Sequence, residues 1–233
     1  MSIRPATAQD EPAITLACRN AFFEESLFGQ TIHVNRHQYP DDMRIFFSTW
    51  LREDLSERNK RVLVATVTES GAEKVIGVAT WQRQGSDTHA QKMQQEWSDP
   101  GKFPALESTK NRAMDPERED ILQRTYPLFK HHWATSTNGL PRSENWYLHL
   151  LGIDPAYGGQ GHGRALVQWG LEQARKEGVH ASVIASDQKD RFYLRSGFDE
   201  VVGNCCEGEG NPLGEADVKG GSIIFKWAGG KEA

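Results

Sequence analysis

Cysteine is scarce in this sequence: only Cys18 and the adjacent pair Cys205 and Cys206 occur among 233 residues. Three cysteines do not make the even-numbered framework of a disulfide-rich secreted protein, and their spacing is not that of a zinc site. We therefore expect a protein of a reducing compartment that holds no metal.

An excess of positive charge is also absent. Lysine and arginine number 27 against 32 aspartates and glutamates, which gives a formal net charge of -5. Nucleic-acid-binding domains are usually basic, so the composition argues against DNA or RNA as a partner.

Long apolar runs are missing as well. A membrane-spanning helix needs about 20 consecutive, mainly apolar residues, and no stretch approaches that length. The N-terminal residues from Met1 to Pro5 have no apolar signal region. We predict a cytoplasmic protein that does not bind a membrane, while no pattern indicates an oligomeric state.

The length is enough to bury one full core, and we expect a single domain over residues 1–233. Between about residues 85 and 143, polar residues dominate and Pro100, Pro104 and Pro116 interrupt the pattern, which indicates an insertion. Elsewhere the periodicity predicts strands near residues 3–4, 61–68, 74–83, 146–153, 181–186 and 222–227, and helices near 10–23, 41–57 and 160–177. Residues 205–221, rich in glycine and acidic groups, predict a loop.

The most informative segment is a glycine-rich turn between a strand and a helix. The apolar strand over residues 146–153 is followed by Asp154 and Pro155, and then by Gly158-Gly159-Gln160-Gly161-His162-Gly163-Arg164. The first N–H groups of a helix have no intrahelical partner, and glycines let a phosphate approach the backbone closely. The pattern thus indicates a diphosphate-binding loop, with a tight turn that binds nothing as the simpler alternative.

Two common phosphate-binding motifs do not fit this segment. In the dinucleotide motif G-x-G-x-x-G/A, counted from Gly161 and Gly163, the last position holds Leu166. In the Walker motif, counted from Gly158 and Gly163, Arg164 and Ala165 stand where lysine and a hydroxyl residue are required.

A third pattern fits better. Gly161 and Gly163 match the last two fixed positions of the motif Arg/Gln-x-x-Gly-x-Gly/Ala, although Gly158 stands at the first, and Tyr193 lies four residues before Gly197 and Phe198. With both motifs in this order, the chain resembles the GCN5-related N-acetyltransferase (GNAT) superfamily, mainly over residues 146–203.

The resemblance implies an α/β fold, in which a mixed, mostly antiparallel central sheet is flanked by helices and two splayed parallel strands bind acetyl-coenzyme A. The pantetheine arm would pair with the backbone of the first strand, and the glycine loop would hold the diphosphate. Carried over by position, the implied coenzyme contacts are Leu151, Gly152, Ile153, Gly158, Gly159, Gln160, Gly161, His162, Gly163, Arg164, Ser186 and Tyr193.

The resemblance also implies catalytic candidates. Tyr193 would be the general acid that protonates the departing thiolate, unless it only packs with its hydroxyl bonded to the backbone. His149, on the strand that meets the thioester, would be the general base, because histidine titrates in a useful range. Its alternative is a hydrogen-bonded core histidine. Glu144 is the competing base, with a solvated carboxylate as its alternative.

The implied activity is transfer of an acetyl group from acetyl-coenzyme A to the amine of a small molecule, by direct attack, because no cysteine lies in either motif. Two alternatives stay open: a non-catalytic acyl-coenzyme A binding or regulatory module of the same fold, and, more remotely, a nucleotide-binding protein. The sequence does not identify the acceptor. The helix near residues 41–57 with Trp50, the insertion with Trp133, and residues 205–221 are expected to border its site.

Overall fold

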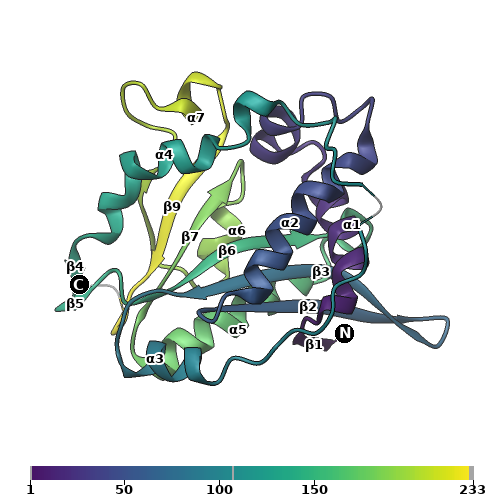
Figure 1. Cartoon of the computed structure of the whole chain (residues 1–233). Helices are drawn as coiled ribbons and strands as arrows, with labels where there is room; N and C mark the ends of the chain where they lie inside the picture. The colour runs from purple at the N-terminus through teal and green to yellow at the C-terminus, as the bar shows by residue number, and fades with distance from the viewer. Residues whose placement is uncertain (1, 107, 231–233) are drawn as a thin grey trace.

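A computed structural model describes residues 2–106 and 108–230 and contains a seven-stranded sheet in the order β1-β2-β3-β6-β7-β9-β8 (Figure 1). Every neighbouring pair is antiparallel except β6 and β7. The prediction of a mixed, mostly antiparallel sheet is therefore confirmed. The strands are β1 Ser2–Pro5, β2 Lys60–Glu69, β3 Ala72–Arg83, β6 Asn145–Ile153, β7 His180–Ser186, β8 Glu200–Asn204 and β9 Gly220–Lys226.

Helices cover both faces of the sheet (Figure 1). Along β2, Val62 and Val64 pack with α1 (Glu11–Phe22) and α2 (Met43–Ser56), whereas Leu63 and Ala65 face the core that contains α5 (His162–Glu177). This alternation is the two-residue period of a strand that is buried on both faces. In the described part of the chain, no helix has the length and apolar character needed to cross a membrane.

Close packing of α5 on the sheet depends on a glycine. A Cβ on Gly170 would lie 2.1 Å from the ring of Trp81, a fully buried residue. The indole N–H of Trp81 donates a hydrogen bond to the carbonyl of Leu166 at 3.2 Å, which fixes the ring beneath the helix. Gly170 and Trp81 thereby let α5 pack closely on the sheet at β3.

The segment expected to be an insertion contains several short regular elements. It forms α3 (Thr88–Gln95), α4 (Ile121–Phe129), a 3-10 turn over Lys130–Trp133 and a small hairpin of β4 (Ser136–Thr137) and β5 (Leu140–Pro141). Ile121, Phe129 and Trp133 share a core with β9 and with Leu213 of α7. These contacts place α4 over the β9 end of the sheet.

Residues 205–221 were predicted to be a loop, and this prediction was wrong for Pro212–Glu215, which form the one-turn helix α7. The Asn211 side chain accepts hydrogen bonds from the N–H groups of Leu213 and Gly214, and Pro212 follows as the first helical residue. Asparagine followed by proline is a helix-start signal that the abundance of glycine and acidic residues masked.

Candidate functional site

The two parallel strands separate part of the way along their length. β6 and β7 pair only from Asn145 opposite His180 to Leu148 opposite Val183. Beyond that point β6 stays paired with β3 on its other side as far as Ile153, while β7 stays paired with β9. The edge of β6 that faces β7 is therefore open over residues 151–153, where an extended ligand could add as a strand.

A β-bulge lies where the strands begin to separate. In the pairing of β3 with β6, Trp81 is opposite Leu148 and Thr80 is opposite Leu150, so His149 is the extra residue. As a result, Leu148 packs in the core on the α5 side, whereas both His149 and Leu150 face α1 and α2. The bulge thus places two consecutive side chains, those of His149 and Leu150, on the same face of the sheet, and such bulges are common near functional sites.

The glycine in this strand has a packing role. A Cβ on Gly152 would lie 3.0 Å from the ring of Phe22 in α1. The bulge of this strand is at His149, and the missing side chain of Gly152 makes room for α1.

The loop before α5 presents a row of unpaired donors. Gly159 and Gly161 have positive φ angles of 73° and 86°, a region that costs other residues free energy. Among the described residues, no group accepts a hydrogen bond from the backbone N–H of any residue from Gly159 to Arg164. These donors lie at the N-terminus of α5, the positive end of its helix dipole, where bound phosphates are commonly found.

Two predicted loop residues behave differently from this row. The N–H of Gly158 donates to the carbonyl of Pro155 at 3.0 Å, so it is already satisfied. The His162 side chain is 5% exposed and lies on the buried face of α5 with Leu166 and Gly170. Of these two residues, only His162 offers a free donor to the loop, and it does so through its backbone.

Tyr193 lies in α6 (Asp190–Arg195), in the core on the α5 side of the sheet. Its ring packs edge-on against Phe192 and Phe198, with centroids 5.0 and 5.7 Å away. No described residue forms a hydrogen bond with its hydroxyl, so the alternative of a hydroxyl bonded to the backbone is not observed. Burial raises the pKa of Tyr193 above its usual value, which keeps the phenol protonated at neutral pH.

His149 lies next to a buried carboxylate, that of Asp54. Its ring stacks edge-on against Trp50 of α2 at a centroid distance of 4.9 Å, and its Nδ1 lies 3.5 Å from Oδ1 of Asp54. The same Asp54 oxygen accepts a hydrogen bond from Lys60 Nζ at 2.7 Å. Burial alone would raise the pKa of Asp54, but His149 and Lys60 outweigh this effect and lower it.

This arrangement defines how His149 can act. A carboxylate beside Nδ1 favours the tautomer with its proton on that nitrogen, which leaves Nε2 as a proton acceptor. Asp54 was not anticipated from the sequence. The signal was available, however, because Asp54 is 1% exposed and lies on the apolar face of α2 with Phe47 and Leu51.

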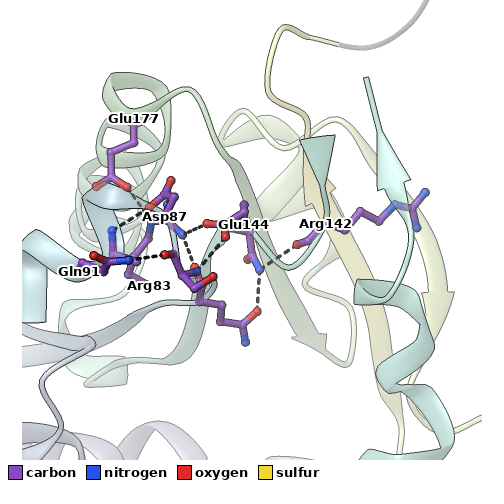
Figure 2. Close-up of polar contacts among 10 residues, drawn as sticks. Arg83, Asp87, Gln91, Arg142, Glu144 and Glu177 are labelled. Carbon is purple, nitrogen blue, oxygen red and sulfur yellow. Dashed lines mark hydrogen bonds and ion pairs between the residues drawn. The ribbon is translucent and has the colours of Figure 1, made fainter. Parts of the chain in front are cut away.

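Glu144 lies elsewhere. It comes just before Asn145, the first residue of β6, whereas Ile153 is the last. Its carboxylate accepts hydrogen bonds from Arg83 Nη1 at 2.9 Å and from the N–H of Ser86 at 2.8 Å. Figure 2 shows that Arg83 also binds Asp87 and Glu177. Glu144 is thus bound to Arg83 at the end of β6 that lies away from the open edge over residues 151–153.

A cavity of about 610 Å³ opens beside His149, and we call it the aromatic cavity. Tyr147, His149 and Ser186 contribute to it from the sheet, and Trp50 contributes from α2. Its remaining walls come from α4 with the turn that follows, from the segment between β8 and β9, and from a π-helical segment, Ser26–Ile32. Trp50, Trp133 and residues of the 205–221 segment, all expected near an acceptor, line this one cavity; the π-helical segment was not anticipated.

Comparisons with known proteins bear on the family and the fold of the chain. Residues 64–213 match the family model described as an acetyltransferase (GNAT) domain. A protein named acetyltransferase from Stachybotrys chartarum is 26% identical over 208 residues, which cover 87% of this chain and 81% of that protein.

Solved structures with the same fold include one named histone acetyltransferase HPA2 and related acetyltransferase, from Corynebacterium glutamicum. It has a TM-score of 0.59 and 18% identity, covering 100% of this chain and 98% of that one. A mosquito arylalkylamine N-acetyltransferase like 5b has a TM-score of 0.52 and 19% identity, covering 96% and 97%. At these identities the likeness concerns the fold alone.

Proposed function

The chain belongs to the GNAT acetyltransferase family, and from this premise we propose that it transfers an acetyl group from acetyl-coenzyme A to the amine of a small molecule. The observation that carries this proposal is the row of unpaired N–H groups from Gly159 to Arg164. It lies at the start of α5, directly after the strand whose edge is open.

We assign coenzyme binding to these two features. The N–H groups from Gly159 to Arg164 bind the diphosphate, and the open backbone edge over Leu151, Gly152 and Ile153 binds the pantetheine arm. Ser186, at the end of β7 and in the wall of the aromatic cavity, lies on the opposite side of the gap between the strands. The coenzyme supplies the activated acetyl group, and the protein positions it.

His149 acts as the general base in this proposal. An amine attacks a thioester only in its neutral form, so an ammonium group must first lose a proton. His149 Nε2 accepts that proton, directly or through a water molecule, and Asp54 holds the imidazole in the required tautomer. The aromatic cavity, which His149 lines, is the proposed acceptor site.

Tyr193 acts as the general acid. It lies on the other face of the sheet from His149, in the core that includes α5, and its phenol keeps its proton because burial raises its pKa. It is therefore suited to protonate the thiolate of coenzyme A as the amine takes the acetyl group.

The proposed activity is tested by incubating the purified protein with acetyl-coenzyme A and a panel of primary amines. Free thiol and N-acetylated amine should form in equal amounts. Coenzyme binding without thiol release from any amine would indicate a non-catalytic binding module. Equal competition by ADP or NAD would instead indicate a protein that binds another diphosphate.

Replacement of Tyr193 by phenylalanine is expected to lower kcat by about 10²-fold, the scale of general acid catalysis. The dissociation constant of coenzyme A, measured by calorimetry, should stay the same, because the ring still packs between Phe192 and Phe198. Tyr39→Phe is the matched control, because Tyr39 lies in a different core cluster from Tyr193 and does not line the aromatic cavity. An unchanged kcat in Tyr193→Phe would remove the acid role.

A further inference from the structure

The aromatic cavity carries information about the acceptor. Its volume of about 610 Å³ falls within the range of pockets that enclose small molecules. Rings form much of its wall: those of Phe28, Trp50, Tyr126, Phe129, Trp133 and Tyr147. Such walls favour a ligand whose body is apolar and flat.

The ring of Trp133 in this wall is held by hydrogen bonds and by packing. The indole N–H of Trp133 donates to Ser182 Oγ at 3.0 Å, and that hydroxyl donates to Asn145 at 2.7 Å. The Trp133 ring also packs against Tyr147 at 6.0 Å and against Phe225 at 5.6 Å. A rigid wall loses little conformational entropy on binding, so its shape selects among ligands.

Charged groups are few in the same lining. Among the described residues of this lining, Glu25 supplies the one carboxylate and Lys219 the one ammonium group. One oxygen of Glu25 accepts hydrogen bonds from the N–H groups of Leu27 and Phe28, and Lys219 forms an ion pair with Asp217. The lining thus offers one carboxylate, next to ring faces that also attract a cation.

This balance discriminates between classes of amine. A polyamine or an aminoglycoside carries several ammonium groups, and burying charges without partners costs several kcal/mol each. A free amino acid brings a carboxylate, for which the lining has only Lys219, already paired. A single ammonium on an apolar body leaves no buried charge without a partner.

We infer that the acceptor is a monoamine whose amino group is carried on an apolar, ring-containing body, in the manner of an arylalkylamine. This inference rests on the proposed function and names its acceptor class. The ring lies among the aromatic side chains of the cavity, and the amino group lies toward His149.

The first test compares amines under identical conditions. With acetyl-coenzyme A saturating, 2-phenylethylamine should give a kcat/KM at least about tenfold above those of spermidine, kanamycin and glycine, the scale that apolar contacts supply. A polyamine or aminoglycoside used as well as 2-phenylethylamine would overturn the inference but leave the proposed function standing. Release of thiol from no amine at all would overturn both.

The second test removes one ring from the wall. Tyr126 lines the cavity and is 51% exposed, whereas Leu128, 43% exposed on the same helix, does not line it. Tyr126→Ala should raise the KM for 2-phenylethylamine about fivefold, with kcat and the KM for ethylamine unchanged. Leu128→Ala should change none of these values. Equal effects of Tyr126→Ala on both amines, or none on either, would contradict binding of the ring in this cavity.

Discussion

Replacement of Gly161 by valine is expected to abolish coenzyme binding. Gly161 has a φ of 86°, and a β-branched residue avoids this region, so the backbone of the loop must shift. The shift misaligns the N–H groups on either side, each of which would donate to a charged phosphate oxygen at about 1.5–3 kcal/mol. Losing two of them corresponds to at least a hundredfold weaker binding, measured by calorimetry with coenzyme A.

The matched control for this variant is Gly178→Val. Gly178 ends the same helix, also has a positive φ, of 68°, and has open space where a side chain would be added. It therefore suffers a similar backbone strain without contacting the loop. Gly178→Val should lower the melting temperature about as much as Gly161→Val and bind coenzyme A normally. A Gly161→Val protein that binds within threefold of the unchanged chain would refute the assignment of the loop.

The strand, the glycine turn and the helix that build this site could be predicted from the sequence, because local signals determine them. The strand over residues 146–153, the glycine turn and the helix that follows are each specified by neighbouring residues, through hydrophobic periodicity and the need for positive φ at Gly159 and Gly161. The helix predicted near residues 160–177 ends at Glu177, and Gly178 follows it in the left-handed conformation.

Features that depend on contacts between distant segments were not predictable in the same way. The bulge at His149 arises from the pairing of β6 with β3 and leaves no mark in the letters around it. The engagement of Glu144 depends on Arg83, whose guanidinium also holds Glu177 of α5. The aromatic cavity joins segments spread along the chain from Glu25 to Gly221, so its residues could be suspected singly but their assembly could not be predicted.

Replacement of Asp54 should affect the orientation of the His149 imidazole without affecting the binding of coenzyme A. Asp54→Asn is expected to lower kcat by about 10²-fold or more, because an amide can donate to Nδ1 and so favour the tautomer that leaves Nε2 without acceptor capacity. The dissociation constant of coenzyme A should not change, since Asp54 pairs with His149 and Lys60 and neither belongs to the glycine loop. Stopped-time assays of thiol release give kcat, and calorimetry gives the binding constant.

The decisive comparison is a double variant. If Asp54 acts only through His149, then His149→Ala combined with Asp54→Asn should be no slower than His149→Ala alone, since residues that act as a unit are not additive. Glu57→Gln serves as the control, because Glu57 accepts a hydrogen bond from Lys60 Nζ at 2.9 Å, as Asp54 does, without contacting His149. It should keep full kcat. A further loss of rate in the double variant would show that Asp54 acts through the fold of α2 and Lys60, and His149 would then lose its proposed partner.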